Sequence, residues 1–127
     1  MTASEETSQR NDLRREISRA LVAIFKEATG RGPAQALTYI NENVILTLLR
    51  DTITTAERTL LEEDQDQAVR SLRRLFQGVV RDQAIEAVER LTGHKVLAFL
   101  SDHAVDPDYA VEVFILEPGL TREGDAN

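Results

Sequence analysis

Two strongly apolar segments separated by a turn constrain the fold more than any other feature of this chain. They lie within residues 93–117, GHKVLAFLSDHAVDPDYAVEVFILE, on either side of Asp106-Pro107-Asp108. Proline fixes φ and aspartate hydrogen-bonds to nearby backbone, so this tripeptide is typical of a turn. The β-branched and aromatic residues around it are typical of strands. The segment therefore predicts a β-hairpin that closes the domain.

A second hairpin and three helices are predicted before it. Strands are indicated at residues 37–41 and 44–50, joined through asparagines that tolerate positive φ. Thr54 and Glu57 form a capping-box signature that opens a short helix, and a long helix is indicated from residue 65 to 91. Gly30 and Gly93 are predicted helix stops. A first helix from Asn11 is indicated by apolar residues at three- and four-residue steps: Leu13, Ile17, Leu21, Ile24, Phe25 and Ala28.

The predicted order of elements is α-β-β-α-α-β-β. This order favours an α+β fold with a four-stranded, mainly antiparallel sheet and helices packed on it. The strand order within the sheet does not follow from the pattern. With 127 residues, one domain is expected over residues 11–117. Residues 1–10 are predicted to be a disordered N-terminus and residues 118–127 a flexible C-terminal tail.

The predicted strands are apolar on both faces, although successive side chains of a strand point to opposite sides. Strand 44–50, for example, has Leu46 on one face and Leu49 on the other. A sheet with one solvated face shows a cleaner alternation, so we expect a homodimer to cover the second face. The alternative is that the first helix covers one face and the long helix the other. The residues expected to be buried are Leu72, Phe76, Val80, Val96, Leu100 and Val113.

Composition excludes several classes of function. The net charge of −7 argues against binding to nucleic acid, which depends on neutralising phosphates. The chain contains no Cys, which excludes disulfides and thiolate metal sites. The polar N-terminus is not a signal peptide, and no apolar run approaches the roughly 20 residues of a transmembrane helix. We expect a soluble, cytoplasmic protein.

The sequence Ser101-Asp102-His103 contains the residue types of a nucleophilic triad. Alternation along a strand directs Asp102 away from the face that Ser101 and His103 share, so the base would lack its orienting carboxylate. The aspartates beside Pro107 are typical of a turn and match no calcium-binding loop. We therefore predict no catalytic residue, no metal site and no cofactor.

Arg31, Asp102 and His103 remain as candidate ligand-binding residues. Arg31 lies on a helix-to-strand turn that Pro33 stiffens, and Asp102 lies where the third strand ends. We expect Arg31 and Asp102 each to have a fixed partner within the domain before any ligand. A set of arginines on the long helix is expected to form a solvated, salt-bridged face, with binding to an acidic partner or lipid as the alternative. This set comprises Arg70, Arg73, Arg74 and Arg81.

Several short motifs, taken in order, resemble the MpsC-like (YbcI-type) family of small bacterial proteins over residues 12–117. They are Gly30-Arg31-Gly32-Pro33, Thr54-Thr55-Ala56-Glu57, Leu91-Thr92-Gly93, Ser101-Asp102, Asp106-Pro107 and Val113-Phe114-Ile115-Leu116. The resemblance implies association with a sodium-translocating, membrane-potential-generating system whose other members are membrane proteins. It implies no catalytic residue.

The leading hypothesis is a non-enzymatic, soluble accessory protein that acts as a homodimer and serves a membrane complex handling ions or bicarbonate. A sensor domain for a small molecule or anion, with a pocket near Arg31 and Asp102, is the alternative. A small enzyme is the third hypothesis.

Overall fold

The computed structural model describes residues 2–119 as a four-stranded antiparallel sheet with its helices on one side. The elements follow the predicted order α-β-β-α-α-β-β, which confirms the α+β fold class. The helices are α1 (Ala3–Thr29), α2 (Thr55–Glu62) and α3 (Asp66–Thr92). The strands are β1 (Gln35–Asn41), β2 (Val44–Arg50), β3 (Val96–Ala104) and β4 (Tyr109–Leu116).

The sheet order is β1-β2-β4-β3, so the C-terminal hairpin joins the N-terminal one through its last strand. Every neighbouring pair is antiparallel, with Leu46 opposite Val113 at the junction of the hairpins. This places the two most apolar strands, β2 and β4, in the middle of the sheet. Central strands are paired on both sides. Their backbone groups are therefore not open to pairing with another chain, although their side chains are apolar.

The helix ends follow the local chemistry of the chain. Gly30 and Gly93 end α1 and α3 in the left-handed conformation, with φ of 82° and 73°, as predicted. Thr54 caps α2 through the predicted capping box with Glu57. The first helix starts at Ala3 instead of Asn11, because Thr2 and Glu5 form another capping box. The tail predicted for residues 118–127 falls mostly outside the described residues.

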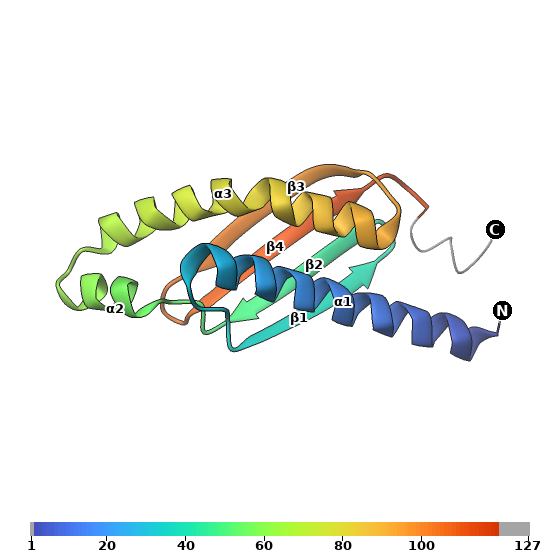
Figure 1. The fold of residues 1–127 in the computed structure, drawn as a ribbon, viewed down its shortest axis with the longest axis horizontal. Helices are drawn as coiled ribbons and strands as arrows, with labels where there is room; N and C mark the ends of the chain where they lie inside the picture. Colours follow the sequence, from blue (N-terminus) through green and yellow to red (C-terminus); the bar gives the residue numbers. More distant parts are fainter. Residues whose placement is uncertain (1, 120–127) are drawn as a thin grey trace.

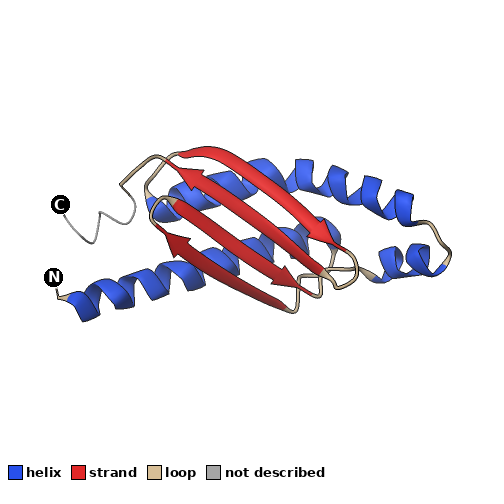
Figure 2. Ribbon diagram, turned by 180° about the vertical axis from the view of Figure 1, so that it is seen from behind, coloured by secondary structure: helices blue, strands red, loops and turns tan. Residues whose placement is uncertain are grey.

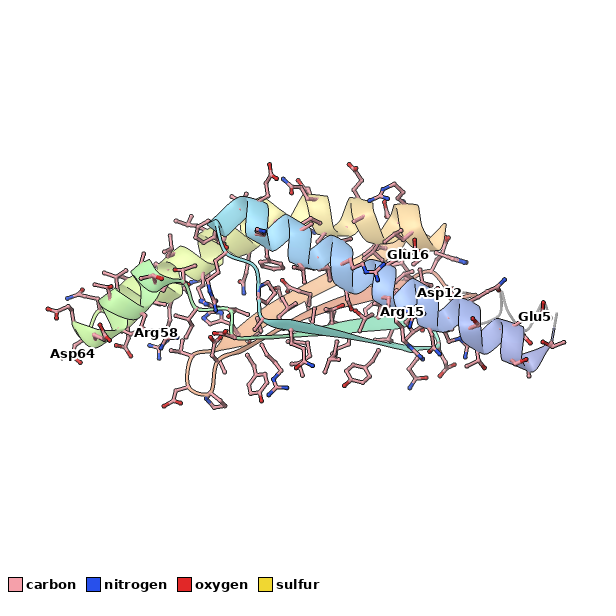
Figure 3. All side chains as sticks on the ribbon, turned by 60° about the horizontal axis from the view of Figure 1, so that its bottom comes forward. Glu5, Asp12, Arg15, Glu16, Arg58 and Asp64 are labelled. Carbon is pink, nitrogen blue, oxygen red and sulfur yellow. The ribbon has the colours of Figure 1, made fainter. Side chains whose placement is uncertain are left out.

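Both long helices lie on the same face of the sheet (Figure 1), and the view from behind shows the strands in front of them (Figure 2). The alternative in which α1 and α3 cover opposite faces is therefore wrong. The charged side chains of α1, among them Asp12, Arg15 and Glu16, are exposed on the outer surface of the helix (Figure 3). The core between helices and sheet contains Ile17, Leu21, Ile45, Ala84, Val88, Phe114 and Leu116.

The opposite face of the sheet is apolar, and no element of residues 2–119 covers it (Figure 2). The register aligns Tyr39, Leu46, Val113 and Leu100 in one row across all four strands. Leu100 and Tyr39 are each 55% exposed, whereas Leu46 and Val113 are half-buried. The predicted burial of Leu100 is wrong for the single chain, because this residue lies on the face away from the helices. Val80 is buried as predicted, and Leu72, Phe76, Val96 and Val113 are half-buried.

Candidate ligand pocket

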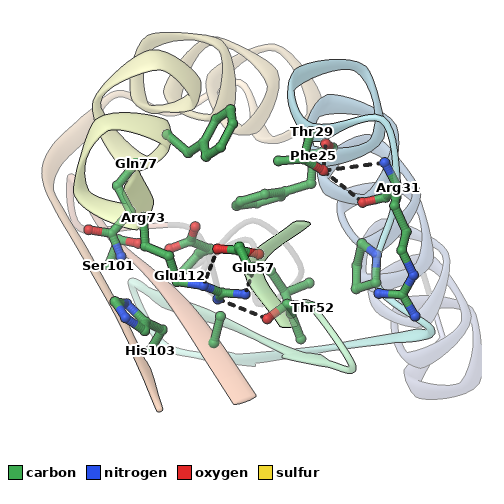
Figure 4. A pocket seen from close by; sticks show the side chains of 14 residues that line it. Phe25, Thr29, Arg31, Thr52, Glu57, Arg73, Gln77, Ser101, His103 and Glu112 are labelled. Carbon is green, nitrogen blue, oxygen red and sulfur yellow. Dashed lines mark hydrogen bonds and ion pairs between the residues drawn. The ribbon is translucent and has the colours of Figure 1, made fainter. Parts of the chain in front are cut away.

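A pocket lies between the covered face of the sheet and the helices, toward the α2 end of the molecule (Figure 4). Its volume is about 50 Å³, which is room for a few water molecules or a small group. The residues that line it come from every helix and from three strands: Phe25, Thr29, Arg31, Pro33, Leu49, Thr52, Glu57, Arg73, Phe76, Gln77, Ser101, His103, Ala110 and Glu112. Several of these, including Phe76 and Gln77, are half-buried, so the pocket reaches the surface.

A buried ion pair forms one wall. Arg73 of α3 donates from Nε to Glu57 Oε2 at 2.9 Å and from Nη2 to Glu57 Oε1 at 3.2 Å. The side chains of Arg73 and Glu57 are only 10% and 4% exposed. Glu57 Oε1 also accepts from the backbone N–H of Thr54, so the carboxylate that caps α2 is the same one that neutralises Arg73.

Thr52 connects this ion pair to the β3–β4 hairpin. Its hydroxyl accepts from Arg73 Nη1 at 2.9 Å and donates to Asp108 Oδ1 at 2.7 Å. Asp108 Oδ2 accepts from the backbone N–H of Ile53 at 2.9 Å. Burial alone would raise the pKa of Asp108, but the hydrogen bonds from Ile53 and Thr52 outweigh it and lower that pKa below its ordinary value. Asp108 is therefore a carboxylate that fixes the loop between β2 and α2.

Glu112 is the exceptional residue of the pocket. It lies on β4 between Ala110 and Phe114 on the covered face, and only 1% of its surface is exposed. Burial raises its pKa to about 7, and a hydrogen bond from Ser101 opposes this rise only partly. The atom Oε2 has no hydrogen-bond partner among the described residues. A carboxyl group in this state can take up or release a proton near neutral pH.

His103 lines the pocket on the neighbouring strand. Its Nδ1 atom is buried and lacks a hydrogen-bond partner within residues 2–119. Burial lowers the pKa of His103 below its ordinary value; the charge of Arg73 acts in the same direction, and Asp102 and Glu57 act against it. The imidazole is therefore neutral at pH 7 and offers a hydrogen-bond donor at one nitrogen and an acceptor at the other.

Arg31 lines the far side of the pocket from Arg73 and His103 (Figure 4). As predicted, it has a fixed partner within the domain. Its Nη1 donates to the carbonyl oxygens of Asp51 and Ile53 at 2.8 and 3.1 Å, and Nη2 contacts Asp51 Oδ2 at 2.7 Å. Arg31 therefore holds the end of β2 and the loop that follows it.

Asp102 does not join the other two candidate residues. It is exposed on the opposite face of β3, while Ser101 and His103 point into the pocket. This is the alternation that argued against a nucleophilic triad. The carboxylate accepts from the backbone N–H of His103, and no partner elsewhere in the domain fixes it. Within residues 2–119, the partner of Asp102 is therefore the backbone of the next residue and not a distant group of the fold.

The arginines of α3 do not form a single face. Arg70, Arg74 and Arg81 are exposed, and Arg81 lies 3.6 Å from Asp82. Arg73 is buried against Glu57, so placing it among the solvated arginines was wrong. The sequence carried a signal for this difference, because Arg73 lies four residues after Val69 and seven before Val80, on the buried stripe of α3.

The sequence pattern identified Glu57 only as a helix-capping residue, and it did not point to Glu112. Glu112 is a carboxylate among Ala110, Phe114 and Leu116, which is an unusual residue for an apolar strand face. Its burial depends on which face of the sheet the helices cover, and the sequence pattern did not determine that face. Within residues 2–119, no group of three or more His, Cys, Asp or Glu side chains is arranged to hold a metal ion.

Fold and pocket together define a small α+β domain with one face of its sheet uncovered and a mainly apolar pocket, which contains buried charged groups, beneath its helices. The family described as the Na⁺-translocating membrane potential-generating system (MpsC) matches residues 9–118, and the chain belongs to this family. It is 25% identical over 103 residues to "Uncharacterized protein YrhF" of Bacillus subtilis (strain 168), covering 80% of this chain and 84% of that protein. No solved structure matches significantly. No helix in the described part of the chain is long and apolar enough to cross a bilayer.

Proposed function

We propose that this protein is a non-enzymatic, cytoplasmic accessory protein that acts as a homodimer in the membrane-potential-generating system after which its family is named. The observation that carries the proposal is the uncovered apolar face of the sheet in a chain of this family. Such a face supports the presence of a partner, and the family name provides a membrane system that soluble subunits can serve.

The second copy of the chain is the partner that suits the face best. A contiguous patch of partly exposed apolar side chains that runs across four strands is typical of an interaction site. A two-fold dimer buries the same face on both copies, so one set of residues satisfies both chains. Two sheets packed face to face form a core about 10 Å thick from their inner side chains. The residues available for this contact are Leu37, Tyr39, Val44, Leu46, Leu48, Leu100, Val111, Val113 and Ile115.

The edges of this face are polar, as the rim of an interface should be. Arg50 lies over the ring of Tyr109, with 5.8 Å between the guanidinium carbon and the ring centroid, and donates to Gln35 Oε1. Asp102 lies at another edge, on β3. These groups remain hydrated in a sheet-to-sheet dimer while the central apolar row is buried.

Light scattering at micromolar concentration tests the dimer. We expect a mass near twice the 14.2 kDa of the chain, and a mass near 14.2 kDa overturns the homodimer. Leu100→Lys places a charge in the central row and should give monomers. Leu75→Lys is the matched control, because Leu75 is 68% exposed on α3, on the helix side of the sheet. If Leu75→Lys is a monomer while Leu100→Lys remains a dimer, the interface lies on the helices and not on the open face of the sheet.

Cross-linking in intact cells, followed by purification from detergent-solubilised membranes, tests the accessory role. We expect an integral membrane protein of the same system to be recovered with the wild-type chain. The accessory role is wrong if the chain is recovered only with itself, even after cross-linking. This outcome would leave the dimer untouched, so the two parts of the proposal can fail separately.

A further inference from the structure

Glu112 leaves a buried hydrogen-bond acceptor without a partner inside the pocket. Its side chain points into the space between α1, α3 and the sheet (Figure 4), and its Oε2 atom is shielded from solvent. Leaving a buried polar atom unpaired costs free energy that a hydrogen bond would recover. A ligand that donates a hydrogen bond at this atom would recover it.

The other charged groups of the pocket are already compensated. Arg73 is neutralised by Glu57, and the guanidinium of Arg31 is directed to Asp51 and to backbone carbonyls. Neither arginine is therefore available as a counter-ion for Glu112, whose hydrogen bond from Ser101 supplies no charge. An ionised Glu112 lacks a cation, so a cationic ligand fits the site and an anion does not.

The surroundings of Glu112 favour a ligand with an apolar part. Phe25 of α1 and Phe76 of α3 line the pocket together with Leu49 and Ala110. Aromatic rings attract cations over their faces and pack well against apolar carbon. His103 Nδ1 offers a second acceptor in one of its neutral tautomers, and an ammonium group has three N–H donors.

We propose that this pocket binds a small organic cation, a primary ammonium on an apolar group of one or two carbons, as its volume of about 50 Å³ allows, through the carboxylate of Glu112, with His103 as a second acceptor. This site lies on the helix side of the sheet. It is therefore independent of the dimer proposed through the opposite face.

The proposal predicts a pH dependence of binding. The titratable or charged groups that face the pocket are Glu112 on β4, His103 on β3, Arg73 on α3, Glu57 on α2 and Arg31 after α1. Of these, Glu112 is the carboxyl that titrates near neutrality, and an alkylammonium stays charged between pH 6 and pH 8. A cation requires the ionised carboxyl, so affinity should rise roughly tenfold from pH 6 to pH 8 as Glu112 loses its proton.

Calorimetric titration of the full chain with methylammonium, with methanol as the uncharged probe, tests the site. At pH 8 we expect the wild type to bind methylammonium at least ten times more tightly than methanol. Glu112→Gln keeps the shape of the side chain and should lose at least tenfold in methylammonium affinity. Asp102→Asn removes a carboxylate from the neighbouring strand on the other face and should bind like the wild type.

The proposal is overturned by the absence of any heat of binding with methylammonium, by equal affinity for the two probes, or by unchanged methylammonium affinity in Glu112→Gln. Circular dichroism establishes that the variant is folded, which is expected because the amide removes a charge from a buried position. Equal losses in Asp102→Asn and Glu112→Gln would show a general effect of surface charge and would also reject the site.

Discussion

Arg73 of α3 and Glu57 of α2 form a buried ion pair through two nitrogens and two oxygens, at 2.9 and 3.2 Å. Glu57 at the same time caps its own helix, and Arg73 reaches Thr52, which donates to Asp108. One arginine thus connects α3 to α2, to the loop after β2 and to the turn of the C-terminal hairpin. The geometry of the ligand pocket depends on this network, since Glu57, Arg73 and Thr52 all line it.

Replacing Arg73 with Met should destabilise the protein by about 3–5 kcal/mol, because Glu57 would remain buried without its partner. The free energy of unfolding from urea denaturation measures the change. Arg70→Met, three residues earlier and exposed, is the control and should change stability by no more than about 0.5 kcal/mol. A double variant, Arg73→Met with Glu57→Gln, should recover part of the loss. Equal stabilities of Arg73→Met and Arg70→Met would show that the ion pair contributes nothing.

Replacing Glu112 with Gln should stabilise the protein in a pH-dependent way. The folded state holds the proton of Glu112 up to a pKa of about 7, whereas the unfolded chain releases it near 4.5. Between these values the folded state binds more protons, so the contribution of Glu112 to stability is fully present below pH 4.5 and falls as pH rises to about 7. Relative to the wild type, Glu112→Gln should gain up to about 3 kcal/mol between pH 4.5 and pH 8.

Chemical denaturation of both proteins at pH 4.5 and pH 8 gives this difference directly. Other titrating groups, including Asp108, cancel because both proteins contain them. A difference between variant and wild type that is the same at both pH values would place the pKa of Glu112 near its ordinary value.

The features that the sequence predicted are those with a local cause. Gly30 and Gly93 end helices because glycine adopts positive φ freely, and Thr54 begins one because its hydroxyl bonds to the N–H of Glu57. The Asp106-Pro107-Asp108 turn also has a local cause, because proline restricts φ and aspartate bonds to nearby backbone. The strands on either side of it lie within residues 93–117, as predicted. In each case a few adjacent residues determine the conformation, so no knowledge of the rest of the fold is needed.

The features that the sequence did not predict depend on which face of the sheet the helices cover. Leu100 and Phe99 are both apolar, and only the position of α1 and α3 leaves Leu100 exposed while Phe99 packs against the core. The same choice buries Glu112 and turns Asp102 outward. A strand that is apolar on both sides gives no local preference, so the candidate site could be identified at His103 and Arg31 but not at its central carboxylate.

Arg31→Ala should lower stability by about 1–2 kcal/mol, because three hydrogen bonds to Asp51 and Ile53 are lost from a partly exposed position. Arg31→Lys should recover only part of this loss, since an ammonium cannot reproduce the planar fork of the guanidinium. Arg58→Ala is the control, as Arg58 is exposed on the nearby helix α2. Thermal unfolding of the three variants compares them. A loss in Arg58→Ala as large as in Arg31→Ala would reflect total charge instead of the contacts of Arg31.

The last prediction separates the core from the open face through two truncations. Phe114→Ala removes a fully buried ring and should cost about 3–5 kcal/mol at any protein concentration, because the cavity lies within one chain. Leu100 is 55% exposed in the single chain, so Leu100→Ala should have little effect on the monomer itself. If Leu100 is buried between two copies, the truncation weakens their association, so Leu100→Ala should melt at a lower temperature than the wild type wherever the wild type is dimeric, and its melting temperature should rise with protein concentration no more steeply than that of the wild type. Melting curves recorded over a hundredfold range of concentration, roughly from one micromolar upward, distinguish these cases. Melting temperatures independent of concentration for the wild type and for Leu100→Ala would show that the open face is not buried by a second copy.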